Sequence, residues 1–192
     1  MVEFARLPAT ACGEALRAII ATRRERGRRV RIAVTAALAA VPCVATVLVS
    51  PQPLLLWNAS ASTPRGLYRV HPGAAVHRGD GIVAWLAEPY RSLAARRGYL
   101  PLGVPLVKRI AAVPGDRVCA HGATVSINGN MAAVRKSLDA LGRALPAWRG
   151  CRDLGAHEYL LLGESPWSFD GRYFGPTDKR DIVGRAVLLW RV

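Results

Sequence analysis

The sequence predicts a mainly β, antiparallel domain that follows a single N-terminal transmembrane helix. Two observations predict it. An uncharged apolar run, residues 32–49, follows an arginine-rich segment, and short runs rich in branched and aromatic residues recur from Leu67 onward. With 192 residues, 51% of them hydrophobic, the chain is long enough for one domain core and a modest extra segment. We therefore divide it into a basic cytoplasmic arm (1–31), a transmembrane anchor or signal segment (32–50) and an outer β domain (51–192).

The arm and the apolar run together predict the topology. Residues 1–31 carry eight arginines and three glutamates, a charge of +5. A helix of about 18 residues spans roughly 27 Å, close to the ~30 Å hydrocarbon core of a bilayer. Because arginines precede the run and no charged residue follows it until Arg65, the N-terminus is expected in the cytoplasm and the β domain outside. The alternatives are a signal peptide cleaved near Cys43–Ala45 and a buried soluble helix.

The basic charge also limits the partners. A net charge of +14 suits nucleic acid or anionic lipid, but beyond the arm the charge is scattered and no nucleic-acid-binding motif accompanies it. We expect a lipid bilayer and no specific nucleic acid. Only three of the 27 basic residues are lysines: Lys108, Lys136 and Lys179. A buried lysine can lose its proton and act as a base, whereas arginine cannot.

Five runs predict the strands of the β domain, because each is rich in branched or aromatic residues and bounded by Gly, Pro or Asp. They are GIVAWL (81–86), VPLVKRIAAV (104–113), TVSI (124–127), EYLLL (158–162) and IVGRAVLLW (182–190). Asn128-Gly129 predicts a tight hairpin turn after the third run. A short helix is expected within residues 132–148, in an insertion of the sheet.

The predicted topology places Cys119 and Cys151 together in an oxidising compartment, where a disulfide is favoured. Closing a loop of about 33 residues would contribute roughly 3–4 kcal/mol in the chain-entropy model. Two unpaired thiols are the alternative. The four histidines show no metal-ligand spacing with one another or with the cysteines, so we expect no metal site and no cofactor.

The stretch NASASTPRGLYR (58–69) contains two candidate nucleophiles, Ser60 and Ser62. A serine hydroxyl needs a base within hydrogen-bonding reach, and no histidine has a recognisable triad context. Lys108 is the candidate base, since strand alternation turns it to the same face as its apolar neighbours two residues away. If that face packs inward, burial lowers the lysine pKa from about 10.4 toward 7. An exposed Lys108 on an edge strand is the alternative.

Three motifs resemble those of a known family. VKRIAAVPGDRV (107–118) resembles the lysine box of the type I signal peptidase superfamily, and SFDGRYFGP (168–176) resembles its C-terminal box. The pattern S-x-P-x-G-x-Y from Ser62, with Cys119 and the segment 145–151, is similar to the TraF-type conjugal-transfer signal peptidases. The resemblance covers about residues 30–192 and implies the coiled antiparallel sheet of signal peptidases.

The resemblance also implies roles for individual residues. Ser62 would be the nucleophile and Lys108 the general base. Ser60 would help the Ser62 backbone N–H bind the oxyanion, although a turn residue bonding its own backbone is the alternative. The other matched positions are the lysine-orienting Ser168 and the structural supports Asp170 and Arg172. The sequence has Gly-Glu-Ser-Pro-Trp at 163–167 where general signal peptidases have Gly-Asp-Asn-Arg, which puts the supporting roles in question.

By this resemblance the chain is expected to be a serine endopeptidase of the bacterial inner membrane with its catalytic domain in the periplasm. Its substrate would be a conjugative pilin precursor or another exported, membrane-inserted protein, and conjugation-channel proteins are further candidate partners. Water or the pilin's own terminal amine would resolve the acyl-enzyme, the latter giving a cyclic subunit. The alternatives are a general type I signal peptidase, a LexA-like self-cleaving repressor and a non-catalytic pilus or secretion assembly protein. The absence of Met after Ser62 argues against the first, and the apolar run against the second.

Overall fold

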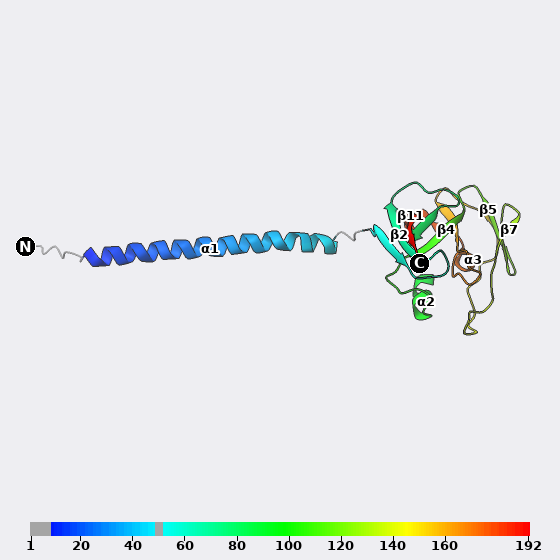
Figure 1. Cartoon of the computed structure of the whole chain (residues 1–192), viewed down its shortest axis with the longest axis horizontal. Coiled ribbons are helices and arrows are strands. Elements are labelled where there is room, and N and C mark those ends of the chain that lie inside the picture. The colour runs from blue at the N-terminus through cyan, green and yellow to red at the C-terminus, as the bar shows by residue number, and fades with distance from the viewer. Residues whose placement is uncertain (1–8, 49–51) are drawn as a thin grey trace, which may run out of the picture. The chain divides into compact units, whose positions relative to one another are not determined.

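The computed structural model of the chain describes residues 9–48 and 52–192 (Figure 1). The chain divides into two units between residues 51 and 52. This division lies next to the boundary that the sequence predicts at residue 51 between the apolar segment and the β domain. Each unit is considered by itself below.

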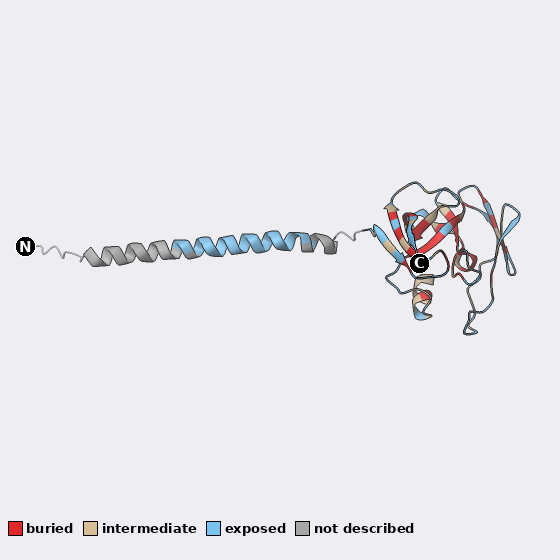
Figure 2. Cartoon of the chain, viewed as in Figure 1, coloured by how far each residue is buried: buried red, intermediate tan, exposed pale blue. Residues whose placement is uncertain are grey.

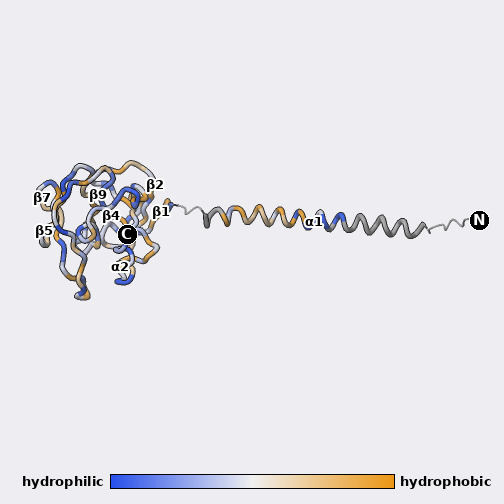
Figure 3. Tube along the Cα trace, turned by 180° about the vertical axis from the view of Figure 1, so that it is seen from behind, coloured by the Kyte–Doolittle hydropathy of each residue, from blue (hydrophilic) through white to orange (hydrophobic). Residues whose placement is uncertain are grey.

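The described part of the first unit is one helix, α1 (Ala9–Leu48). It runs through most of the basic arm and into the apolar run. The boundary expected at residue 31 is therefore a change of side-chain chemistry within one helix, which Figure 3 shows as a change from hydrophilic to hydrophobic. No helix in the described part of the chain combines the length and apolar character needed to cross a bilayer. Residues 49 and 50 of the predicted anchor lie outside the described residues, and the anchor stays a prediction.

The second unit contains a seven-stranded sheet whose neighbouring strands are all antiparallel, as the sequence predicts. Its strands, in spatial order, are β1 (Leu55–Asn58), β2 (Gly66–Pro72), β11 (Ile182–Arg191), β3 (Gly81–Ala84), β4 (Leu106–Ala112), β9 (Glu158–Leu162) and β10 (Thr177–Asp178). The last strand in the chain, β11, lies between β2 and β3. It joins the part of the sheet that carries the serine loop to the part that carries the lysine strand.

A second, four-stranded antiparallel sheet follows the Pro-Gly-Asp turn after β4. Its strands, in spatial order, are β7 (Asn130–Val134), β6 (Thr124–Ile127), β5 (Arg117–His121) and β8 (Gly150–Asp153). The hairpin between β6 and β7 turns at Asn128 and Gly129, whose φ angles of 51° and 83° are those expected for an Asn-Gly turn.

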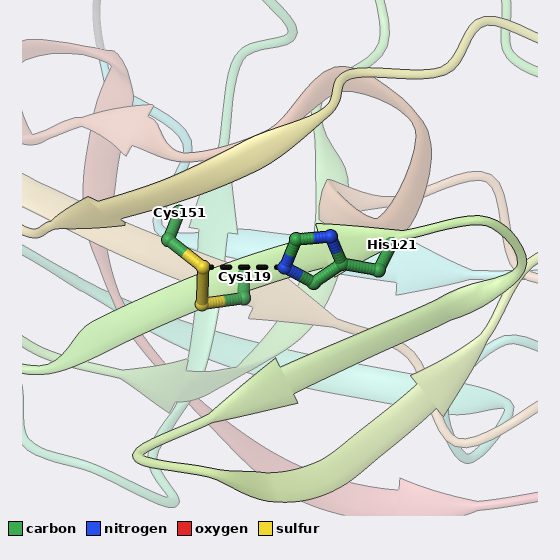
Figure 4. Close-up of side chains that lie close together, drawn as sticks. All are labelled: Cys119, His121 and Cys151. Atoms are coloured by element: carbon green, nitrogen blue, oxygen red, sulfur yellow. Dashed lines mark hydrogen bonds between the residues drawn. A yellow bond between two sulfur atoms is a disulfide. The ribbon is translucent and has the colours of Figure 1, made fainter.

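A disulfide joins β5 to β8. Cys119 and Cys151 lie directly opposite each other in the antiparallel pair and are bonded, with an S–S distance of 2.02 Å. His121 lies beside them, with its Nε2 atom 3.4 Å from Cys151 Sγ (Figure 4). Because the two sulfurs are bonded to each other, neither is a thiolate that could hold a metal.

The seven-stranded sheet is covered by core residues on both faces. Ile82 and Val83, consecutive in β3, are both fully buried and belong to different apolar clusters. In Figure 2 the buried residues accordingly concentrate in the strands of the second unit, while the described side chains of α1 are exposed. Burial on both faces explains why several strands appear in the sequence as continuous apolar runs rather than as alternating ones.

The predicted runs 124–127 and 158–162 coincide with β6 and β9, and the other three contain β3, β4 and nearly all of β11. The helix expected within 132–148 is wrong. The Asn-Gly turn folds residues 130–134 back along β6 as a strand, and pairing overrides the local helix preference of the alanines. An irregular segment with one bridge, between Leu138 and Ala144, leads on to β8. The helices of this unit are α2 (Tyr90–Arg96), α3 (Gly171–Phe174) and a 3-10 turn (Lys179–Asp181).

Candidate active site

The loop that carries Ser60 and Ser62 connects β1 to β2 and is organised by Asn58. This buried side chain donates from Nδ2 to Thr63 Oγ1 at 2.9 Å and to the carbonyls of Ser60 and Pro64 at 3.1 and 3.0 Å. Its Oδ1 accepts from the Ser60 backbone N–H at 3.1 Å. These bonds fix the loop from the last residue of β1 onward. Asn58 was not predicted as a site residue, although an Asn before a Ser-rich turn is a known local signal.

Ser62 and Lys108 meet within the fold. Lys108 Nζ lies 2.5 Å from Ser62 Oγ, within hydrogen-bonding distance, and the two residues are only 4% and 9% exposed. Lys108 lies in β4, between the buried residues Leu106 and Ile110 of the same face, while its neighbour Arg109 is exposed. The inward orientation predicted for Lys108 is confirmed, and the exposed alternative is wrong.

The surroundings of Lys108 favour its neutral form. Burial lowers the pKa of its ammonium from 10.5 to about 8; the carboxylate of Asp170 opposes this shift and the guanidinium of Arg172 adds to it. With that pKa, about a tenth of the amine is neutral at pH 7. A neutral amine at 2.5 Å can accept the proton of the serine hydroxyl.

Ser60 lies beside Ser62. Its Oγ is 2.8 Å from Ser62 Oγ and accepts from the Ser62 backbone N–H at 3.2 Å. This bond to a backbone N–H two residues on is the turn role that the sequence left open. The same geometry also places the Ser60 hydroxyl next to both the Ser62 hydroxyl and the Ser62 backbone N–H.

Gly163 allows two site residues to approach each other. A Cβ added to it would lie 2.2 Å from Ser168 Oγ and 2.8 Å from the Ser62 carbonyl oxygen, so any other residue would clash. Ser168 is 2% exposed, and its Oγ has no hydrogen-bond partner among the described residues. It lines the same cleft as Lys108 without bonding to it. The lysine-orienting role of Ser168 therefore stays a prediction.

Asp170 and Arg172 form a buried pair behind Gly163. Asp170 is fully buried and accepts from Arg172 Nε at 2.8 Å and from the Gly163 backbone N–H at 2.7 Å. Arg172 Nη2 donates to the Gly163 carbonyl at 3.1 Å. The next residue, Glu164, donates its backbone N–H to the Ser62 carbonyl at 2.8 Å. The pair thus supports Ser62 through the backbone of Gly163 and Glu164, even though residues 163–167 depart from the general signal peptidase pattern.

Ser62 and Lys108 line a cleft of about 760 Å³. Most of its wall is apolar, with Leu86, Leu106 and Phe169 among the lining residues. Ser62, Lys108 and a few other polar groups interrupt this wall. A concave, mainly apolar site with a few placed polar groups is typical of a substrate-binding cleft.

Comparison with known proteins places this geometry in a family. Residues 27–191 match the family described as signal peptidase, peptidase S26. The chain belongs to the peptidase S26 signal peptidase family.

Within the peptidase S26 family, the chain is similar to plasmid transfer proteins. It is 35% identical to "Plasmid transfer protein TraF" of Escherichia coli in an alignment that covers 69% of this chain and 82% of that protein. It is 32% identical to "Probable conjugal transfer protein TraF" of Sinorhizobium fredii, over 67% of this chain and 73% of that protein. A crystal structure of a signal peptidase I from Enterococcus faecalis matches 58% of this chain and 97% of that chain, at 21% identity and a TM-score of 0.34. The TraF-type resemblance seen in the sequence is confirmed.

The positions of the predicted residues in this peptidase S26 chain fall into three groups. Those brought within hydrogen-bonding distance are Ser60, Ser62 and Lys108. Those behind Ser62 are Asp170 and Arg172, which bond to Gly163, and Ser168, which packs against Gly163. The disulfide of Cys119 and Cys151 lies in the other sheet.

Proposed function

We propose that the chain is a membrane-anchored serine endopeptidase that processes a conjugative pilin precursor during plasmid transfer. The observation that carries the proposal is the buried Lys108 amine, 2.5 Å from Ser62 Oγ. Membership of the peptidase S26 family supports the reaction class, and the TraF relatives support the process.

The proposed reaction proceeds in two stages. Neutral Lys108 accepts the Ser62 hydroxyl proton while Oγ attacks the scissile carbonyl, and the resulting ammonium gives that proton to the departing amine. An ester between Ser62 and the substrate remains. Lys108, neutral again, then takes a proton from water, which releases a linear product, or from the pilin's own terminal amine, which closes a cyclic one.

Oxyanion stabilisation comes from the serine loop in this proposal. The Ser62 backbone N–H and the Ser60 hydroxyl lie next to the reacting Oγ, and a substrate oxygen would replace the bond that they make to each other. A donor of this kind typically contributes about 3 kcal/mol to lowering the barrier.

The test is an intact mass of the pilin precursor after co-expression with the wild-type chain or with Ser62→Ala. We expect a shortened product with wild type and unprocessed precursor with the variant. A product lighter by one water than the linear fragment would show that an amine resolves the ester. Identical masses with both proteins would contradict pilin processing. A generic exported precursor, treated in the same way, then distinguishes a general signal peptidase from a non-catalytic assembly protein.

The lowered pKa of Lys108 predicts how the rate depends on pH. The amine is the base only when neutral, so kcat/KM should rise with pH through about 8 and level off above it. The measurement is kcat/KM across this range with a peptide substrate that has no titrating group. A rate that is independent of pH through 8, or that falls, would contradict Lys108 as the base.

A further inference from the structure

A second cavity adjoins the active-site cleft. It is a groove of about 1040 Å³ beside the end of β5 and the start of β8. Residues that line both the groove and the active-site cleft are Lys136, Leu138, Asp139, Ala140, Leu145 and Trp167. A peptide seated at Ser62 can therefore continue along these shared residues into the groove.

The groove is lined by three cations without matching anions. Arg135, Lys136 and Arg149 all line it, and in the part of the chain that the structure describes none of them forms a salt bridge. Arg135 is only 6% exposed, and its guanidinium donates to two carbonyls: Nε to Gly122 at 2.9 Å and Nη1 to Trp148 at 2.6 Å. A buried guanidinium that lacks a counter-ion is costly, and an incoming carboxylate would offset this cost.

The one acidic residue that lines the groove, Asp139, is already engaged. Its carboxylate accepts from the Tyr99 hydroxyl, from Arg143 Nε at 2.6 Å and from the backbone N–H of Leu141 at 2.9 Å. Burial raises the pKa of Asp139, but these bonds outweigh it and hold the pKa well below its ordinary value. The carboxylate therefore stays ionised on its own partners, and the groove keeps an excess of positive charge.

The groove is also held in place before any ligand arrives. Trp148, just before Arg149, donates from its indole Nε1 to the Gly171 carbonyl at 2.9 Å, and Cys151, two residues after Arg149, is bonded to β5. Figure 4 shows this disulfide with His121, which also lines the groove. Because the backbone on both sides of Arg149 is fixed, binding an anion there costs little backbone entropy.

We propose that this basic groove binds an acidic segment of the peptide substrate, adjacent to the bond that Ser62 attacks. This inference rests on the proposed function, from which it takes a peptide as the substrate. It adds a specificity determinant: carboxylates of the substrate pair with Arg149 at the groove surface and with Lys136 and Arg135 further in.

The test measures binding without catalysis, in the full-length chain with Ser62→Ala. The probes are two short labelled peptides that share an apolar half and differ only in carrying glutamates or glutamines in the other half. We expect the glutamate peptide to bind about tenfold more tightly, since charge-assisted bonds to a preorganised site are worth this much. Adding Arg149→Glu should abolish the preference.

Arg185→Glu is the matched control, because it makes the same charge change at an exposed β11 residue outside both cavities. This variant should keep the preference. Equal binding of the two peptides, or equal losses in the two variants, would overturn the inference. So would tighter binding of a short single-stranded DNA that Arg149→Glu abolishes, because the groove would then be a nucleic-acid site.

The binding assay separates this inference from the proposed function. If wild type fails to process the pilin precursor but the glutamate preference depends on Arg149, the groove is an acidic-peptide site and the pilin assignment is wrong. If wild type processes the precursor and the preference is absent, the groove inference alone is wrong.

Discussion

Replacing Lys108 by arginine is expected to abolish cleavage, with kcat/KM falling about 10⁴-fold or more. Arginine keeps the positive charge and the length to reach Ser62. Its guanidinium, however, does not lose a proton at any accessible pH, so it cannot accept the proton of the Ser62 hydroxyl. Lys108 Nζ lies 2.5 Å from the Ser62 hydroxyl, and burial lowers the pKa of its ammonium to about 8. The lysine can therefore accept the proton that arginine cannot. The measurement is the rate of precursor processing by purified variants at matched concentration.

The control for this variant is Arg109→Lys. Arg109 is the next residue of β4 and is exposed on the opposite side, and among the described residues its side chain bonds only to the exposed Glu164, at 3.3 Å. The exchange should leave cleavage within about threefold of wild type, since an exposed ion pair contributes roughly 0–1 kcal/mol. Thermal unfolding of both variants checks that they are folded. A folded Lys108→Arg protein that still cleaves would exclude the Ser-Lys dyad.

The second large effect concerns stability. Asp170→Ala should lower the free energy of unfolding by about 3–5 kcal/mol, the usual cost of removing one partner from a buried ion pair. The change leaves the Arg172 guanidinium buried without its carboxylate and deprives the Gly163 N–H of its acceptor. Chemical denaturation followed by tryptophan fluorescence gives the difference from wild type.

Asp153→Ala provides the comparison for Asp170→Ala. Asp153 also pairs with an arginine, Arg117 at 3.1 Å, but both side chains are exposed. Its loss should cost less than about 1 kcal/mol. Similar losses in the two variants would mean that the buried pair does not support the site in the way that its bonds to Gly163 indicate.

Local patterns in the sequence predicted the residues that are proposed to carry the chemistry. Alternation in one strand put Lys108 on the same face as Leu106 and Ile110 but left open whether that face packs inward, and a family motif named Ser62. The C-terminal box also named the supports Asp170 and Arg172, but not Gly163, to which both bond. Gly163 contacts Ser62 across about a hundred positions of sequence, and its role depends on a close approach that no local pattern records.

Tertiary context also explains the errors. The strand β7 takes residues that local preference favours as helix, because the Asn-Gly hairpin provides β6 as a pairing partner. The strands β5 and β8 were not predicted, since neither carries a long apolar run. They pair with each other, and the disulfide joins them. Propensity is a weak guide wherever pairing between strands decides the outcome.

The position of β11 has a consequence for biosynthesis. This strand is synthesised after the other described strands, yet it pairs with β2 on one side and β3 on the other. The serine loop precedes β2, and Lys108 lies in β4, which pairs with β3. A nascent chain therefore cannot bring Ser62 and Lys108 into register until β11 has been inserted. That insertion closes loops of about a hundred residues or more and is slow for that reason. The proposed peptidase is thus expected to remain inactive until β11 is in place.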